Sequence, residues 1–178
     1  MTPLRTRIGP EDHVVGPRDA PIQMLEYGDY ECPFCGRAFP EVEKVRRTLA
    51  DVLLFAYRHF PLSRVHPHAM LAAEAAEAAA AQGRFWDMHA ILFLNQSALE
   101  AHDLVGYAGE LDLDIDRFAA DLSGHRFLPK VRRDFLSGAR TGVNGTPTFF
   151  INGFRHDGPF DADALIEALQ GGRVAPQL

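Results

Sequence analysis

The chain lacks the features that mark several large classes of protein. Its 178 residues contain only two cysteines and one tryptophan. No apolar run has the length of a membrane-spanning helix, and no glycine-rich phosphate-binding loop is present. A net charge of −6 argues against a general nucleic-acid-binding protein. We therefore expect neither a membrane span nor a nucleic-acid partner.

The first fifteen residues are polar and lack the apolar middle region of a secretory signal. This predicts a cytoplasmic protein, or an extracytoplasmic one if a signal has been removed. Since 47% of the residues are hydrophobic, the chain can bury the core of one folded domain.

The apolar runs of the first third of the chain predict an α/β fold. Residues 22–27 have the character of a strand, and a helix is expected to start near Cys32. Residues 52–57 are almost wholly apolar, which is typical of a strand covered on both faces. Strand, helix and strand in such close succession indicate a right-handed parallel crossover.

Helical patterns dominate the middle of the chain, and strand character returns near its end. The apolar spacing predicts helices over residues 69–81, 84–94, 102–111, 115–122 and 128–138. A strand over residues 148–151 is followed by Asn152-Gly153, the strongest short hairpin signal. Asp161 is suited to cap a last helix, and the tail from Gly171 is expected to fray.

These patterns divide the chain into three parts. Residues 1–20 are expected to form an irregular lead-in, rich in proline, glycine and charge. Residues 21–64 and 141–171 are expected to form the α/β core, and residues 65–140 a helical insertion.

The two cysteines lie in the run Glu31-Cys32-Pro33-Phe34-Cys35. This spacing suits a redox-active disulfide at the first turn of a helix, and Pro33 is suited to the first helical position. The same spacing suits two zinc ligands, and two inert buried cysteines are a further alternative. The expected helix start favours redox chemistry, because unpaired N–H groups there stabilise a thiolate.

On this interpretation Cys32 is the attacking thiol and Cys35, one turn further in, resolves the mixed disulfide. The neighbouring Glu31 opposes the Cys32 thiolate, because like charges repel. A zinc site would have to recruit histidines from elsewhere in the chain, and the candidates are His66, His68, His89 and His102. Four basic residues near the fifth helix are expected to line a solvated helix face: Arg126, Lys130, Arg132 and Arg133.

Together these residues resemble the DsbA-like disulfide oxidoreductases of the thioredoxin superfamily over about residues 13–169. The shared features are the Cys-Pro-Phe-Cys motif, Pro40, the helical insertion, Gly145-Thr146-Pro147-Thr148, and the segments at residues 57–61 and 85–89. The resemblance implies a thioredoxin fold, in which a mixed central sheet is flanked by helices, with an all-helical insertion.

The resemblance also implies roles for individual residues. Pro147 would follow a cis bond and lie against the cysteines, although an X–Pro bond is cis in only about 5–6% of cases. Thr146, Phe34 and Pro33 would contact an extended substrate peptide. Glu26 would be a buried acid that moves a proton for Cys35; its alternative is an exposed strand carboxylate.

The expected activity is disulfide exchange with protein or peptide thiols, supported by an unidentified electron donor or acceptor. No cofactor or metal is expected beyond the Cys32–Cys35 pair. Phe34 stands where strongly oxidising relatives often have histidine, so the direction of exchange stays open. The alternatives are a non-catalytic peptide-binding module, a zinc-binding protein, and a glutathione-transferase-like protein, which both cysteines argue against.

Overall fold

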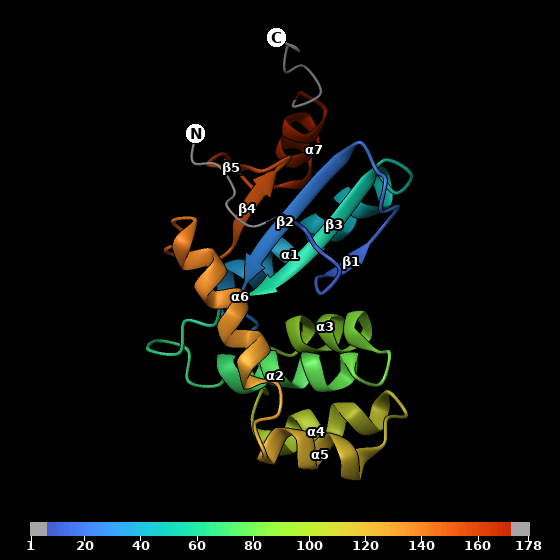
Figure 1. Cartoon of the computed structure of the whole chain (residues 1–178), viewed down its shortest axis with the longest axis vertical. Helices are drawn as coiled ribbons and strands as arrows, with labels where there is room; N and C mark the ends of the chain where they lie inside the picture. The colour runs from blue at the N-terminus through green and yellow to red at the C-terminus, as the bar shows by residue number, and fades with distance from the viewer. Residues whose placement is uncertain (1–6, 172–178) are drawn as a thin grey trace.

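The structure is a computed structural model that describes residues 7–171 (Figure 1). The fraying expected after Gly171 and the first six residues of the expected lead-in lie outside this range. The core is one sheet with the strand order β1-β3-β2-β4-β5. The strands are β1 (His13–Val15), β2 (Ile22–Gly28), β3 (Leu53–His59), β4 (Thr148–Ile151) and β5 (Phe154–His156). Only β2 and β3 are parallel, which confirms the predicted mixed sheet.

Strand β1 corrects the expectation of an irregular lead-in over residues 1–20. Its residues His13, Val14 and Val15 pair with Tyr57, Ala56 and Phe55 of β3, antiparallel. Three residues are too few to show an alternating pattern, and the pairing joins positions about 40 residues apart. The strand exists because an edge of β3 is available to it, which no local pattern reveals.

Helices cover both faces of the sheet. Helix α1 (Pro33–Thr48) connects β2 to β3 and packs beside α7 (Ala162–Gly171). Alternate residues of β2 enter opposite cores: Ile22 and Met24 lie in the core shared with α1 and α7, whereas Leu25 and Tyr27 lie in a smaller core on the other face. The sheet is therefore buried on both sides, as the apolar strands predict.

Five helices stand between β3 and β4 in the chain. They are α2 (Ala69–Ala80), α3 (Phe85–Leu94), α4 (Ala101–Glu110), α5 (Ile115–Ser123) and α6 (Leu128–Arg140). Their ends differ from the predicted ones by at most two residues. Figure 1 shows α2 to α5 gathered beyond one end of the sheet, while α6 runs back toward β4. Within residues 7–171 no helix combines the length and apolarity that crossing a bilayer requires.

The predicted hairpin and final cap are confirmed. Asn152 and Gly153 have φ angles of 49° and 84°, the positive values that a tight turn between β4 and β5 requires. The carboxylate of Asp161 accepts a hydrogen bond from the N–H of Ala164 at 3.0 Å and caps α7. The turn after α6 then brings the chain back to the ends of β2 and β3, where the cysteines lie.

Candidate active site

The cysteine pair lies at the amino end of α1. Cys32 is the residue before the first helical position, with φ −71° and ψ 120°, and Pro33 begins the helix. Pro33 lacks an N–H and therefore leaves no unpaired donor there. Cys35 lies in the first turn and is fully buried, and no disulfide joins the two cysteines.

The two sulfurs have opposite acidities. The hydrogen bond from the Cys35 thiol makes the largest contribution to lowering the pKa of Cys32 to about 5, the N–H groups of Cys35 and Phe34 add to it, and burial opposes it. Burial, followed by the interaction with Cys32, raises the pKa of Cys35 well above its usual value. The site thus combines one acidic thiol with one that keeps its proton. The carboxylate of Glu31, expected to oppose the Cys32 thiolate, hydrogen-bonds the ring of His68.

The segment before β4 lies against Cys32. The Thr146–Pro147 peptide bond is cis, the geometry that the resemblance implied. The carbonyl oxygen of Thr146 accepts a hydrogen bond from the sulfur of Cys32 at 3.4 Å. Residues 114 positions apart in the sequence are thereby brought into contact.

Glu26 is buried in the centre of β2, and the alternative of an exposed strand carboxylate is wrong. Only 3% of its surface is exposed, and Oε1 has no hydrogen-bond partner within the described residues. Burial raises the pKa of Glu26 to about 8. The charges of Glu26 and Cys35 interact, so an ionised Glu26 further disfavours the Cys35 thiolate.

Pro33 and Phe34 form an exposed surface beside Cys32. The ring of Phe34 is 52% exposed. The guanidinium of Arg37 lies 4.5 Å from the centre of that ring, a cation–π contact. Phe34 and Arg37 together therefore present an apolar and cationic surface to the solvent.

Asp29 is a site residue that the sequence analysis missed. Its buried carboxylate accepts hydrogen bonds from the N–H of Glu31, the N–H of Leu62 and the ring of His66, each at 2.8 Å. Glu31 bonds the ring and the N–H of His68 at 2.8 and 2.7 Å. Two carboxylate–histidine pairs thus tie the loop after β3 to the cysteine motif. No local signal reveals them, because their partners lie 37 residues away.

The histidines considered for zinc are engaged elsewhere. His66 and His68 contact carboxylates, while Nδ1 of the buried His89 lies 3.0 Å from the hydroxyl of Tyr30. His102 lies at the surface near Glu100 and Asp103. Within residues 7–171 the histidines that the zinc hypothesis required do not gather around the cysteines.

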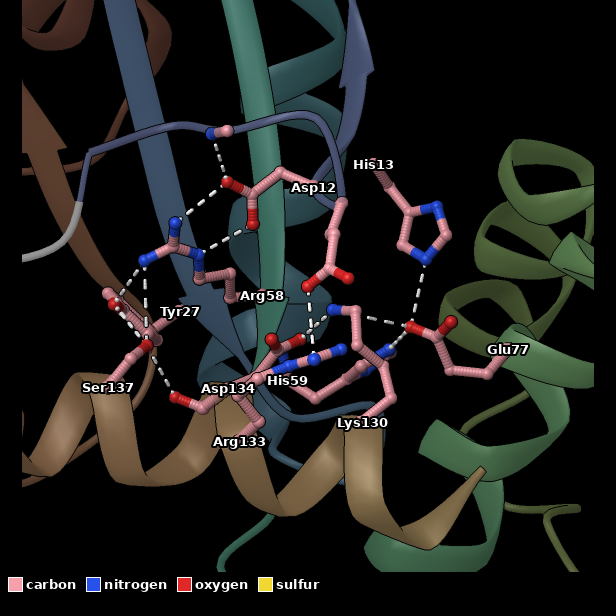
Figure 2. Close-up of polar contacts among 12 residues, drawn as sticks. Asp12, His13, Tyr27, Arg58, His59, Glu77, Lys130, Arg133, Asp134 and Ser137 are labelled. Carbon is pink, nitrogen blue, oxygen red and sulfur yellow. Dashed lines mark hydrogen bonds and ion pairs between the residues drawn. The ribbon is translucent and has the colours of Figure 1, made fainter. Parts of the chain in front are cut away.

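A second polar cluster joins the sheet to the insertion (Figure 2). His13 of β1 and His59 of β3 each place Nε2 2.8 Å from one carboxylate oxygen of Glu77 in α2. The ammonium of Lys130 lies 2.6 Å from Asp134 and 3.8 Å from Glu77. The prediction of a solvated basic face is therefore wrong for Lys130, whose side chain is 13% exposed.

Donor atoms of His59, Glu77 and Asp134 all lie within 4.8 Å of one another, close enough to be considered for a metal. Lys130 already supplies a positive charge to both carboxylates, so we treat the cluster as a structural ion-pair network. Nearby, Arg58 pairs with Asp12 at 2.7 Å and donates a hydrogen bond to the hydroxyl of Tyr27 (Figure 2). Burial raises the pKa of Glu77, but hydrogen bonds from His13 and His59 outweigh it and hold that pKa below its usual range.

The sheet, its flanking helices and the cysteine pair at the start of α1 define a protein with a thioredoxin fold. A family model described as thioredoxin matches residues 9–171, and the chain belongs to this family.

Solved structures share this architecture. A thioredoxin-like oxidoreductase from Silicibacter pomeroyi superimposes with a TM-score of 0.84 and 25% identity, covering 94% of this chain and 95% of that one. BdbD from Bacillus subtilis superimposes with a TM-score of 0.82 and 23% identity, covering 90% and 91%. Wolbachia pipientis α-DsbA1 superimposes with a TM-score of 0.78 and 22% identity, covering 94% of each chain.

The curated relatives are longer proteins. The chain is 49% identical over 169 residues to the Na(+)/H(+) antiporter NhaA 1 of Mycobacterium sp. (strain KMS), covering 93% of this chain and 28% of that protein. It is 42% identical over 171 residues to the Na(+)/H(+) antiporter NhaA of Herminiimonas arsenicoxydans, covering 96% and 27%. The chain thus spans just over a quarter of the length of these relatives.

Proposed function

We propose that the protein is a thiol–disulfide oxidoreductase that exchanges disulfides with protein or peptide thiols through Cys32 and Cys35. The observation that carries this proposal is the difference in acidity between the two thiols. With a pKa of about 5, Cys32 is a thiolate at neutral pH and can attack a disulfide. Cys35, whose pKa is raised, stays protonated until it attacks the mixed disulfide.

In the reducing direction, the Cys32 thiolate attacks one sulfur of a substrate disulfide and releases the other as a thiolate. Cys35 then loses its proton, attacks Cys32 in the mixed disulfide and releases the second substrate sulfur. The protein gains the Cys32–Cys35 disulfide while the substrate disulfide gains two electrons and becomes two thiol groups, which take one proton that Cys35 has lost and one proton from the solvent. In the oxidising direction the same steps run backwards and a substrate dithiol becomes a disulfide.

Glu26 is proposed as the group that takes the proton from Cys35. Its pKa of about 8 gives it both ionised and protonated forms near neutral pH, as a general base requires. Its unpartnered Oε1 is free to accept a proton directly or through a water molecule.

Thr146 and Pro147 are proposed to hold the substrate beside Cys32. The carbonyl of Thr146 already meets the Cys32 sulfur at 3.4 Å, so a peptide attacked by that sulfur passes next to this backbone. Pairing with an extended peptide is a form of strand addition. Pro33 and Phe34 would contact the same peptide from the other side of Cys32.

The acidity of Cys32 bears on the direction of exchange. A stable thiolate favours the reduced protein and so makes its disulfide a stronger oxidant, by about 30 mV for each pKa unit. This favours an oxidising role even though Phe34 stands between the cysteines. The reduction potential, measured against glutathione, tests the direction.

The activity itself is tested with a small aromatic disulfide and with a peptide disulfide. Cys32→Ser should abolish exchange with both, and Cys35→Ser should accumulate a mixed disulfide that mass spectrometry detects. Normal multiple turnover by Cys35→Ser would contradict the assigned roles. No exchange by the wild-type protein would favour the non-catalytic peptide-binding alternative.

A further inference from the structure

A groove lies between the loop that follows β3 and helix α6. Its cavity volume is about 680 Å³. Most of its lining is apolar and comes from Pro61, Leu62, Val65, Met70 and Phe135. Val65 is 69% exposed, which leaves a branched apolar side chain in water next to the hollow. Hollow apolar surfaces of this kind are typical of binding sites.

The floor of the groove is anchored in the folded core. The ring of Phe135 stacks on that of Phe60, with ring centres 4.4 Å apart; Phe60 belongs to the smaller core, and Phe135 packs against that core. The N–H of Leu62 donates to Asp29 at 2.8 Å. The shape therefore exists before a ligand arrives, which lowers the entropy cost of binding.

Two arginines give the rim of the groove a positive charge. Arg64 and Arg132 line it, and both are exposed. Within residues 7–171 neither side chain has a carboxylate within ion-pair distance. A basic rim on a chain with a net charge of −6 complements a ligand that carries carboxylates.

The groove is linked to the cysteine site at both of its walls. On one wall, Leu62 and His66 bond to Asp29, which lies three residues before Cys32. On the other, α6 ends at Arg140 and the chain continues to Thr146, whose carbonyl meets Cys32. A protein bound at Cys32 therefore has the groove within reach.

We propose that this groove binds a segment of the substrate protein in which a bulky apolar residue is flanked by aspartate or glutamate. The apolar side chain fills the hollow and the flanking carboxylates pair with Arg64 and Arg132. The groove thus selects among protein thiols and disulfides, an inference that rests on the proposed function.

Binding is measured first with labelled short peptides that contain no cysteine, so that it does not depend on exchange. One peptide carries leucine between glutamates, a second carries lysine in place of glutamate, and a third carries serine in place of leucine. Fluorescence anisotropy should rank the first as the tightest by about tenfold. Equal affinity for all three would overturn the proposal.

A charge-reversed protein gives the second test. The double variant Arg64→Glu, Arg132→Glu should prefer the lysine peptide to the glutamate peptide, a reversal that simple loss of structure does not produce. Arg18→Glu, which reverses one exposed arginine in the segment before β2, is the control and should bind like the wild type. If the double variant still preferred the glutamate peptide, the proposed recognition by Arg64 and Arg132 would be refuted.

The two proposals fail in distinguishable ways. If the wild-type protein does not exchange with the small aromatic disulfide, the proposed function is wrong whatever the peptides show. If that exchange is normal and the peptides bind with equal affinity, only the proposed binding of acidic apolar segments in the groove is wrong. A final experiment places the acidic apolar segment beside a peptide disulfide, where it should lower KM about tenfold relative to the lysine version.

Discussion

Cys32 and Cys35 are the same chemical group, two residues apart, with opposite shifts in acidity. The sulfur of Cys32 meets hydrogen-bond donors at a helix start, while that of Cys35 is enclosed by the core. A donor stabilises a thiolate and desolvation penalises it. The reactivity of the pair is therefore a property of position.

The Cys35 thiol makes the largest contribution to lowering the pKa of Cys32. We predict that Cys35→Ala raises that pKa from about 5 by about one unit or more. The rate of alkylation as a function of pH measures it. Phe34→Ala is the control, because Phe34 acts through its N–H and keeps it. An unaltered pKa in Cys35→Ala would contradict the assigned cause.

Glu26 makes the stability of the protein depend on pH. Its pKa of about 8 lies above the ordinary value of 4.5, so the folded state holds a proton that the unfolded state has lost. The free energy of unfolding should fall as the pH rises from about 4.5 to about 8, by up to about 1.4 kcal/mol for each pH unit.

Glu26→Gln should remove this part of the pH dependence and raise the free energy of unfolding at pH 8, because the buried amide carries no charge. Urea denaturation of both proteins across that range measures the effect. Parallel pH profiles for the two proteins would show that the carboxyl is not held protonated.

Among elements, the loop after β3 is held by side chains from the loop that leads into α1. Asp29 accepts two backbone N–H bonds and one from His66, which places the loop beside Cys32 and also shapes the groove. Burial lowers the pKa of His66, but the bond to Asp29 outweighs it, and the net shift is upward. The contact is strongest below pH 6.5 and weakens as the pH rises through the raised value.

Asp29→Asn replaces one acceptor oxygen by a donor and leaves a buried N–H or imidazole unpaired. We predict a loss of about 1–3 kcal/mol in the free energy of unfolding. Asp51→Asn, at an exposed position, serves as the control and should change it by less than about 0.5 kcal/mol. Equal stability of the two variants would show that Asp29 does not hold the loop.

At the scale of the whole molecule, the buried carboxylate of Glu77 ties the insertion to two strands of the sheet. Glu77 of α2 contacts His13 of β1 and His59 of β3, and Lys130 of α6 lies 3.8 Å away (Figure 2). Because its pKa is depressed, its stabilising effect is complete above pH 4.5 and is lost as the pH falls toward the folded value.

Glu77→Gln removes the negative charge that both imidazoles contact and that Lys130 faces. We predict a loss of about 3 kcal/mol in the free energy of unfolding at neutral pH, and a smaller difference from the wild type in acid. Glu110→Gln, an exposed residue of α4, is the matched control. A loss that does not shrink in acid would mean that packing, rather than charge, explains the effect.

The sequence by itself determined the parts of this protein that depend on neighbouring residues. Apolar spacing predicted the helices of the insertion and the strands β2, β3 and β4, and the Asn152-Gly153 pair predicted the hairpin. The helix start at Cys32 also followed from local signals, because Pro33 fits there. Such features need only residues within a few positions of one another, so a local pattern is enough to reveal them.

Only the tertiary structure decided what depends on distant partners. Strand β1 exists because β3 offers it an edge, and Lys130 is buried because Glu77 and Asp134 meet it. Asp29 finds its imidazole partner 37 residues away. The raised pKa values of Cys35 and Glu26 follow mainly from the burial of both side chains. Desolvation and long-range pairing depend on how the whole chain packs, and no short stretch of sequence determines that packing.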